Sequence, residues 1–398
     1  MRPCEPPFDV LPHKRLRSTT IRSACHQLIL SSSERLLSKR QEHRRKREGS
    51  KVNVDDYFDM RNLRPKTING GCPVSGCTAM LGKVGNQRRE FPLCPMHRLR
   101  IHPKTFVYYN GPDKESKRDA ALRNILFERD YFRGHILGNA AKAETHRICN
   151  ENSEDALTWN VFTGLARFAS LSRLLSTFTQ SSVQGEPELY LWGLRVQLDN
   201  SSAPELFPAL RGARGYFEKG IKKFLTEPDV MLYVPGQWLI LVEAKFTGPN
   251  TIAKTDPSED VDGEKPKSRE GILRRYPSSA LPPGSLLPFS YEGPFYGQLY
   301  RNLVFAVYMA NELKVKWALI NLVCEGQARQ SAAFEDPTPF IHALLPEETR
   351  RRFMFTSWEM IYRNNVVKNP KLKKLAKYMY DKSAFERRAL AVELKSTK

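Results

Sequence analysis

One stretch, residues 227–246, constrains this chain more than any other part of its sequence. Two runs of apolar, β-branched and aromatic residues, 230–234 and 238–242, are separated by Pro235-Gly236-Gln237. Such runs on either side of a short turn predict a β-hairpin. A three-residue loop centred on Gly236 fixes the register, because it pairs residues that lie equally far from that glycine along the chain.

This register places two acids opposite each other at the open end of the hairpin. Asp229 and Glu243 lie equally far from Gly236, and Lys245 points to the same face as Glu243 because side chains alternate along a strand. Like charges that face each other destabilise a sheet, unless a divalent cation lies between them. One or two carboxylates are the usual protein ligands of Mg²⁺. The pattern therefore predicts a site for Mg²⁺ or Mn²⁺ with a lysine beside it.

The residues Pro228-Asp229, followed on the next strand by Glu243-Ala244-Lys245, resemble the PD-(D/E)xK superfamily of restriction-endonuclease-like nucleases. The resemblance implies an α/β core with a mixed central sheet flanked by helices. It also implies that Asp229 and Glu243 bind the metal and that Lys245 assists the hydrolytic water. The alternative is that Pro228 merely opens a strand and that the charged residues form a solvated strand end.

The charge of the chain favours a polyanionic partner. Its 398 residues carry a formal net charge of +20, and the sequence pI is about 9.7. Nucleic acid, most simply DNA, is the first candidate, and an anionic membrane surface is the second. No apolar run approaches the length of a membrane span, so a membrane protein is not expected.

The cysteines predict a second metal site. Seven is an odd number, and without a secretory signal it indicates a reducing, intracellular compartment. Cys72-Pro-Val-Ser-Gly-Cys77 and Cys94-Pro-Met-His97 form two pairs of soft ligands, which match a closed, structural Cys₃His zinc site. They resemble a zinc-ribbon or zinc-knuckle module, in which His102 is an alternative to His97.

Composition divides the chain into four parts. We expect a basic, flexible arm at 1–66, the zinc module at 67–110, a helical connector at 111–150 and the nuclease-like core at 151–398. Within the core, residues 248–294 are rich in Pro, Gly, Ser and charge, which predicts a long loop that is either disordered or a lid over the substrate.

The arm has two interpretations. Its Lys and Arg clusters suit phosphate contacts that order on binding, or else a solvated tail. Residues 13–40 are rich in Arg and Ser and nearly free of acids, which is also typical of a mitochondrial transit peptide. Cytoplasmic, nuclear and mitochondrial locations therefore stay open.

A helix is expected to begin after Ser153, which is a good N-cap, with Leu157 and Val161 on its apolar face. The PD-(D/E)xK resemblance implies a third acid on the helix before the central sheet. Glu154 is the best-placed residue for this role, although an acid at a helix start also interacts well with the helix dipole. Glu151 and Asp155 are alternatives.

The remaining expected elements complete the core. A helix over 296–313 carries Gln298 and Arg301 near its start. By the same resemblance both are candidates to line the site, with Gln298 named for the catalytic site, and the alternative is an ordinary helix surface. The Gly- and Arg-rich segment 211–215 is interpreted as phosphate contacts or an ordinary loop. Further expectations are a helix at 114–135, strands at 189–196, 317–323 and 353–356, and helices at 357–364 and 372–380.

The resemblance thus implies a metal-dependent nuclease that hydrolyses phosphodiester bonds in DNA, of the restriction, repair, recombination or defence type. One alternative is a DNA-binding or assembly protein whose nuclease-like fold is catalytically silent. Another is an RNA-processing nuclease. The sequence leaves a homo-oligomer or a protein partner possible.

Overall fold

The computed structural model describes residues 71–74, 76–82, 91–102, 105–138, 145–168, 171–198, 203–326 and 336–385. All of these lie within the compact unit Asp59–Lys398. The predicted arm at 1–66, including the possible transit peptide, lies outside the described residues.

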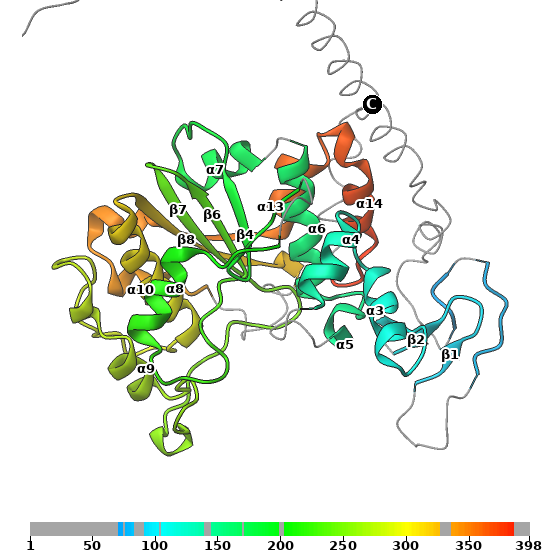
Figure 1. Cartoon of the computed structure of the whole chain (residues 1–398), viewed down its shortest axis with the longest axis horizontal. Coiled ribbons are helices and arrows are strands. Elements are labelled where there is room, and N and C mark those ends of the chain that lie inside the picture. Colours follow the sequence, from blue (N-terminus) through cyan, green and yellow to red (C-terminus); the bar gives the residue numbers. More distant parts are fainter. Residues whose placement is uncertain are drawn as a thin grey trace, which may run out of the picture. The chain divides into compact units, whose positions relative to one another are not determined.

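A six-stranded mixed sheet forms the centre of the core, in the strand order β5-β4-β6-β7-β8-β9 (Figure 1). The first four strands in this order pair antiparallel, whereas β7, β8 and β9 run parallel. The strands are β4 (Glu188–Leu191), β5 (Leu194–Arg195), β6 (Val230–Val234), β7 (Trp238–Ala244), β8 (Lys316–Val323) and β9 (Phe353–Ser357).

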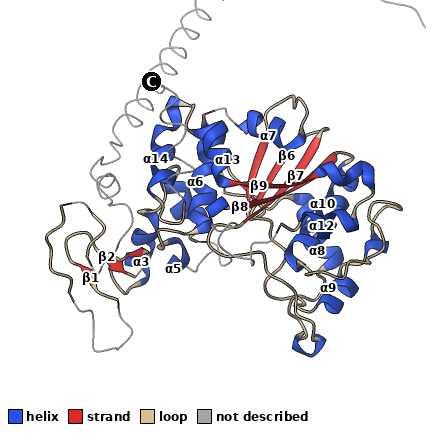
Figure 2. Cartoon of the chain, turned by 180° about the vertical axis from the view of Figure 1, so that it is seen from behind, coloured by secondary structure: helices blue, strands red, loops and turns tan. Residues whose placement is uncertain are grey.

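Alternating side chains of the sheet divide the core into two apolar layers. Val230, Leu232, Ile240, Val242 and Ile320 belong to one buried cluster, together with α6 (Glu154–Arg167), α7 (Leu171–Thr179) and α14 (Lys373–Asp381). Met231, Leu239, Leu241 and Leu319 belong to the other, together with α8 (Pro208–Phe217), α9 (Arg269–Arg275), α10 (Gly297–Leu313) and α12 (Thr338–Leu344). Helices therefore cover both faces of the sheet, as Figure 2 shows, and the predicted α/β restriction-endonuclease-like architecture is confirmed.

The central hairpin has the predicted register. Val230 pairs with Val242 and Val234 with Trp238, so the turn is centred on Gly236, whose φ of +70° suits glycine. The helix α10 connects β7 to the parallel strand β8, and parallel strands need such a crossover.

The expected strand at 189–196 is wrong in one respect. It is two short antiparallel strands, β4 and β5, joined by a tight turn at Trp192 and Gly193 with φ values of 54° and 82°. The apolar pattern continues through the turn because Trp192 is itself buried. The segment 211–215, interpreted as a loop, lies within the helix α8, which begins at Pro208.

A small antiparallel sheet, β1 (Leu93–Cys94), β2 (Leu99–Ile101) and β3 (Phe106–Tyr108), forms the N-terminal module. Its Leu99 and Tyr108 are buried in the same cluster as α6. The helix expected at 114–135 is interrupted, since Glu128 has a φ of 51°. The segment consists of α3 (Lys114–Leu122), α4 (Arg129–Tyr131) and the π-helical turn η2 (Phe132–Ile136), and α5 (Thr145–Ile148) follows.

The segment 248–294, expected as a loop that is either disordered or a lid, contains short helices and buried residues, which favour the second of these alternatives over disorder. It contains the short helices η4 (Pro257–Glu259) and η5 (Ser278–Ala280) on either side of α9. Ile272 and Tyr276 are buried with α8 and α10. The segment thus packs as part of the core on the α10 face of the sheet.

The C-terminal helices pack in the other apolar layer, the one that contains α6 and α7. After the 3₁₀ turn η7 (Glu347–Arg352) and the strand β9 come α13 (Trp358–Ile361), the π-helical turn η8 (Tyr362–Val366), the turn η9 (Pro370–Leu372) and α14. These positions agree with the expected strand and two helices. No helix among the described residues is long and apolar enough to cross a membrane.

Candidate active site and metal cluster

The open end of the β6–β7 hairpin brings the predicted acids together. Asp229 immediately precedes β6, and its Oδ2 accepts a hydrogen bond of 2.8 Å from the backbone N–H of Ala244. This bond holds the Asp229 carboxylate beside the end of β7, next to Glu243. The strands pair as far as Val230 and Val242, the pair next to Asp229 and Glu243, and their register agrees with the turn-based prediction up to that point.

Glu243 is completely buried, and each of its carboxylate oxygens has a donor. Oε1 accepts from the ammonium group of Lys245, and Oε2 accepts from the side-chain amide of Asn302 at 2.7 Å. Side chains two residues apart lie on one face of a strand, which is why Lys245 reaches Glu243. A buried carboxylate needs such partners, since an unpaired buried charge is strongly unfavourable.

Lys245 is held among three acids. Its side chain is 11% exposed, and its Nζ lies 3.8 Å from Oε1 of Glu154 as well as against Glu243. Burial lowers the pKa of Lys245, but the negative charges of Glu243, Glu154 and Asp229 outweigh it and raise this pKa above its usual range. Lys245 therefore carries a positive charge at neutral pH and donates to Glu243.

Glu154 is the alternative that the structure brings to Lys245. It begins α6 after the Ser153 cap, and its Oε2 accepts from the N–H of Phe246 at 2.8 Å. Although 31% of its side chain is exposed, loss of water around the carboxyl raises the pKa of Glu154 to about 6, against the lowering effect of Lys245.

The other two acids are positioned differently. Glu151 is buried away from this group, where it accepts from the hydroxyl groups of Thr105 at 3.2 Å and of Ser383. Asp155 follows Glu154 in the first turn of α6, and its charge contributes to the raised pKa of Glu154.

Gln298 lies on α10 one turn before Asn302, and it is half-buried. The hydrogen bonds of the described residues link Asn302, and not Gln298, to the acids. Residues four apart share one face of a helix, so Gln298 faces the same side as Asn302. Sequence reasoning missed Asn302, the α10 residue that contacts Glu243, and the role of Gln298 stays a prediction.

Two further asparagines escaped the sequence analysis. The side-chain amide of Asn321 on β8 donates to the backbone oxygen of Glu243 at 3.4 Å, and it exchanges hydrogen bonds of 2.8 and 3.2 Å with Asn250. Asn250 and Asn321 are both buried. The sequence signal that points to this network is Asn321 itself, a polar residue within the otherwise apolar run 317–323.

This donor set suits a hard divalent cation. Asp229 and Glu243 offer carboxylate oxygens, which are the ligands that Mg²⁺ prefers, and Glu154 adds a third acid nearby. A cation held there would also offset the repulsion between acids that converge on a single lysine. Asp229 and Glu243 are thus the residues that could hold Mg²⁺ or Mn²⁺.

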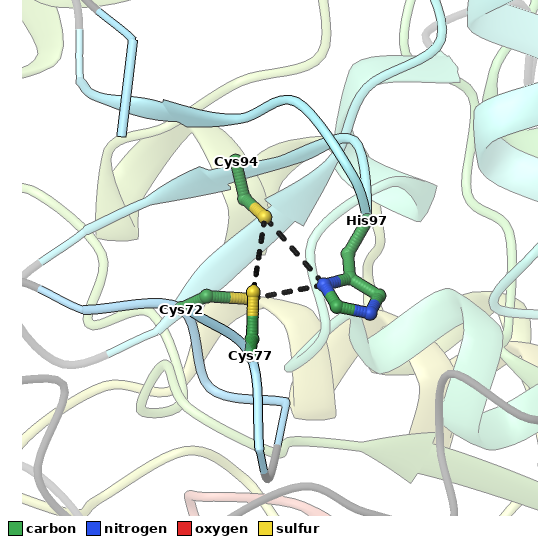
Figure 3. A group of neighbouring side chains, drawn as sticks. All are labelled: Cys72, Cys77, Cys94 and His97. Carbon is green, nitrogen blue, oxygen red and sulfur yellow. Dashed lines mark hydrogen bonds between the residues drawn. The ribbon is translucent and has the colours of Figure 1, made fainter. Parts of the chain in front are cut away.

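The four predicted zinc ligands form a cluster in the N-terminal module (Figure 3). The ligand atoms of Cys72, Cys77, Cys94 and His97 all lie within 4.8 Å of one another. Sγ of Cys77 lies 3.8 Å from Sγ of Cys94, and Nδ1 of His97 lies 3.5 Å from the sulfurs of both Cys72 and Cys94.

These separations match a tetrahedral ion. Zn–S bonds of about 2.3 Å and a Zn–N bond of about 2.0–2.1 Å place two sulfurs roughly 3.8 Å apart and a sulfur roughly 3.6 Å from the nitrogen. His102, the alternative ligand, lies outside the cluster and stacks on Phe91 with ring centroids 3.7 Å apart. His97 is therefore the histidine of the group.

Local turns bring the ligands together. Gly76, with a φ of +78°, and the hydrogen bond of 3.2 Å from Cys77 N–H to Val74 O form the first turn. The second turn connects β1 to β2, and Arg98 N–H donates to Cys94 O at 2.8 Å. The guanidinium of Arg123 on the connector donates to His97 O at 2.8 Å, which fixes the module against α3.

Comparison with known proteins agrees with a restriction-endonuclease-like core. Residues 97–382, well over half of the chain, match the family model described as "Restriction Endonuclease associating with ARP". This match covers Asp229, Glu243 and Lys245 but begins after the three cysteines of the metal cluster. Neither a curated protein nor a solved structure matches the chain significantly.

Proposed function

This chain belongs to the family of restriction endonucleases associating with ARP, and on that premise we propose that it is a metal-dependent nuclease acting on DNA. The observation that carries the proposal is the convergence of Asp229, Glu243 and Glu154 on Lys245 at the end of the β6–β7 hairpin. A fold gains little from three acids gathered around one lysine, whereas phosphodiester hydrolysis uses both kinds of charge.

In this proposal Asp229 and Glu243 hold Mg²⁺ or Mn²⁺. The metal, when bound, polarises the phosphoryl oxygen and activates a water. Glu154 is the third acid, and its bond to Phe246 N–H keeps it close to Lys245. The ammonium of Lys245 orients the attacking water or stabilises the charge that develops on the phosphate.

Two residues of α10 support this arrangement. Asn302 donates to Glu243 at 2.7 Å and so fixes the direction of the carboxylate. Gln298, one turn earlier on the same helix face, is proposed to contact the substrate or its water rather than the acids. The proposed roles differ: Asn302 orients the carboxylate of Glu243, and Gln298 contacts the bound nucleic acid.

The rest of the chain is proposed to hold the substrate. The formal charge of +20 favours the phosphate backbone, and the arm at 1–66, outside the described residues, adds basic clusters. Zinc at Cys72, Cys77, Cys94 and His97 is proposed to stabilise the module at 67–110, since all four positions of a tetrahedral ion are filled. A reducing, intracellular compartment fits this role, because oxidised cysteines would not bind the metal.

The family's name supports a protein partner, ARP, and we propose that association with it accompanies the nuclease activity. The connector at 111–150 and the core at 151–398 stay as the proposed division of the remaining chain. A second candidate function, a silent nuclease-like fold that only binds DNA, predicts the same binding but no cleavage. An RNA-processing nuclease predicts cleavage of a different substrate.

The deciding experiment incubates purified protein with supercoiled, linear and single-stranded DNA and with RNA, with and without Mg²⁺ or Mn²⁺. We expect metal-dependent cleavage of DNA that disappears in Asp229→Asn. The matched control is Asp256→Asn, which removes an equal charge at an exposed position of the 248–294 segment. Equal activity in both variants would refute the assignment, and cleavage of RNA alone would select the RNA-processing alternative.

A further inference from the structure

The loop that connects α8 to β6 leads directly to Asp229 and is held at both of its ends. Glu218, at the start of the loop, is 2% exposed, and its carboxylate accepts from the N–H of Thr226 at 2.9 Å. The backbone oxygen of Thr226 accepts in turn from Nε of Arg214 at 2.8 Å. The hydroxyl of Tyr276 donates to the same Glu218 carboxylate at 2.7 Å. These bonds close the loop just before the candidate active site.

The middle of the loop is held through its backbone on either side of Phe224. Before it, the N–H of Lys222 donates to Gly263 O at 2.9 Å. After it, Leu225 O accepts from Nζ of Lys265 at 3.5 Å. The backbone of Phe224 is therefore fixed by contacts of its neighbours and not by its own ring.

Phe224 has a backbone conformation that is unfavourable for a bulky residue. Its φ is 57°, in the left-handed region. The other aromatic residue with a positive φ in the described ranges, Trp192, is 3% exposed, and its burial offsets the strain. Phe224 is 72% exposed, more than any described large hydrophobic residue except Met80. Burial thus gives Phe224 no such compensation.

The ring of Phe224 also has no aromatic neighbour in the part of the chain that the structure describes. The other two exposed aromatic side chains do: Phe91 stacks on His102 with ring centroids 3.7 Å apart, and Tyr216 stacks on Tyr308 at 5.5 Å. Strained backbone conformations persist where the surrounding structure enforces them, and they gather at functional sites. The stability of the fold therefore does not explain an exposed phenylalanine at this position.

Two lysines next to the ring indicate what it contacts. Lys222 and Lys223 immediately precede Phe224, both are exposed, and neither forms an ion pair within the described ranges. Glu264 pairs with Lys223 through the backbone, but its carboxylate lies 3.9 Å from Nζ of Lys267. Exposed lysines beside a bare ring suit a nucleic acid, whose phosphates attract the lysines and whose bases stack on the ring. Lysine is depleted at protein–protein interfaces, so a protein surface fits less well.

The position of Phe224 in the chain keeps it close to the candidate metal ligands. It is five residues before Asp229, so the two Cα atoms lie at most about 18 Å apart. A nucleic-acid strand advances about 3.4 Å per nucleotide in a duplex. A base on the ring therefore lies only a few nucleotides from a phosphate at Asp229.

We propose that Phe224 stacks on an unpaired base of the bound DNA, a few nucleotides from the phosphate that is cleaved, while Lys222 and Lys223 bind the backbone beside it. An unpaired base is preferred because stacking on it requires no disruption of a base pair. The inference rests on the proposed nuclease function and adds a substrate class to it, namely DNA with an unpaired base near the cleavage position.

The test measures binding, with Ca²⁺ in place of Mg²⁺, to two short DNA duplexes that differ by one unpaired adenine. The wild-type chain should bind the duplex with the unpaired adenine about tenfold more tightly, which is the effect of one base–aromatic stack. Phe224→Asn should lose this preference, because asparagine tolerates a positive φ but has no ring. Phe224→Trp should keep it, and Phe224→Leu, which is apolar without a π-face, should lose it.

The matched control is Tyr216→Ala, which removes an exposed ring that already stacks within the protein, and it should keep the preference. Thermal unfolding provides a second readout. Phe224→Asn should unfold at the same midpoint as wild type or above it, because it relieves backbone strain and removes no buried contact. A structural role for the ring would instead lower the midpoint.

The outcomes separate the stacking role from the proposed activity. A preference that depends on Phe224 in a protein that cleaves no nucleic acid would refute the nuclease function alone. Equal binding of the two duplexes by wild type, or an unchanged preference in Phe224→Asn, would overturn the stacking role even in a protein that cleaves DNA, and would assign the exposed ring to a protein partner. A lowered midpoint in Phe224→Asn would overturn it in favour of a structural role.

Discussion

The two groups of candidate metal ligands in this protein differ in what surrounds them. In the N-terminal cluster, Sγ of Cys94 lies 3.8 Å from Sγ of Cys77 and 3.5 Å from Nδ1 of His97, at distances that match the edges of a tetrahedron. At the hairpin, Glu243 instead has protein donors on both oxygens, from Lys245 and from Asn302.

This difference separates a structural ion from a functional one. Thiolates that face one another need the cation itself to offset their repulsion, so we expect metal binding and folding to be coupled in the cysteine cluster. The acids at the hairpin have an internal counter-charge and amide donors, so the core is expected to fold without Mg²⁺. A site that is stable without its metal can exchange it along with substrate and product.

The largest effect should follow from loss of a zinc ligand. Cys94→Ser should lose the ion and unfold the segment around β1, β2 and β3, because structural zinc binds with an apparent free energy of about 10–16 kcal/mol in isolated modules. The core helices should stay folded. Elemental analysis for one zinc per chain and hydrogen exchange of the module's amides measure this.

The matched control for that variant is Cys149→Ser, which alters a buried thiol outside the cluster and should keep the zinc. Freshly purified wild-type protein that contains no zinc would contradict the assignment of the cluster. Chelation must be avoided in tests of Mg²⁺, since it would remove both ions at once.

Replacement of Glu243 tests the second group, the acids at the hairpin. Glu243→Gln leaves the buried ammonium of Lys245 without its closest anion, so we expect a loss of about 3 kcal/mol in the free energy of unfolding and no cleavage. Omission of Mg²⁺ from a zinc-containing buffer should abolish cleavage with almost no change in stability. Urea unfolding and cleavage assays measure both effects, with the exposed α10 residue Glu312 changed to Gln as the control.

Full activity in Glu243→Gln would remove this residue from the metal site. A large stabilisation of the core by Mg²⁺ alone would show instead that the acids need their ion to fold, which would erase the difference between the two groups.

A smaller effect is expected for the lysine that the acids surround. Lys245→Met should reduce turnover by about 10²–10³-fold, which is typical for the loss of one electrostatic donor to the transition state. The Mg²⁺ concentration for half-maximal activity should change little, because no metal bond is lost. Steady-state kinetics measure both, and Lys316→Met at the exposed start of β8 is the control. Normal turnover in Lys245→Met would assign the lysine a structural role only.

Sequence alone predicted the parts of the site that depend on local pattern. The turn at Gly236 fixes which residues face each other, and the Ser153 cap fixes where α6 starts. The spacing of Cys72 and Cys77, and of Cys94 and His97, reflects turns of a few residues. In each case, neighbours along the chain determine the geometry.

The parts that were missed depend on packing between distant segments. Asn302 and Asn321 reach Glu243 across separations of 59 and 78 residues, and no local pattern links them to it. The choice among Glu151, Glu154 and Asp155 depends on how α6 packs on the strand ends. The turn at Trp192 could not be recognised from the sequence, because the Trp192 side chain is apolar and buried like those of the strand residues on either side.

The smallest predicted effect concerns Lys265, a lysine outside the group formed by Asp229, Glu243 and Glu154. Burial, followed by the charge of Arg301, lowers the pKa of Lys265 to about 8, while Glu218, Glu243 and Glu227 oppose this shift. The folded chain therefore binds fewer protons than the unfolded chain between pH 8 and the ordinary lysine pKa of about 10.4. Over this window the contribution of Lys265 to stability improves as the pH rises.

Nucleic-acid binding should respond in the opposite direction, since Lys265 loses its charge as the pH rises through about 8. We expect affinity for a duplex in Ca²⁺ to fall by roughly two- to five-fold between pH 7 and 9, which is the loss of about one weak phosphate contact. Lys265→Arg should bind equally at both values, because a guanidinium stays charged. Lys267→Arg should keep the wild-type decrease. A decrease that survives unchanged in Lys265→Arg would assign it to another group and separate Lys265 from the substrate.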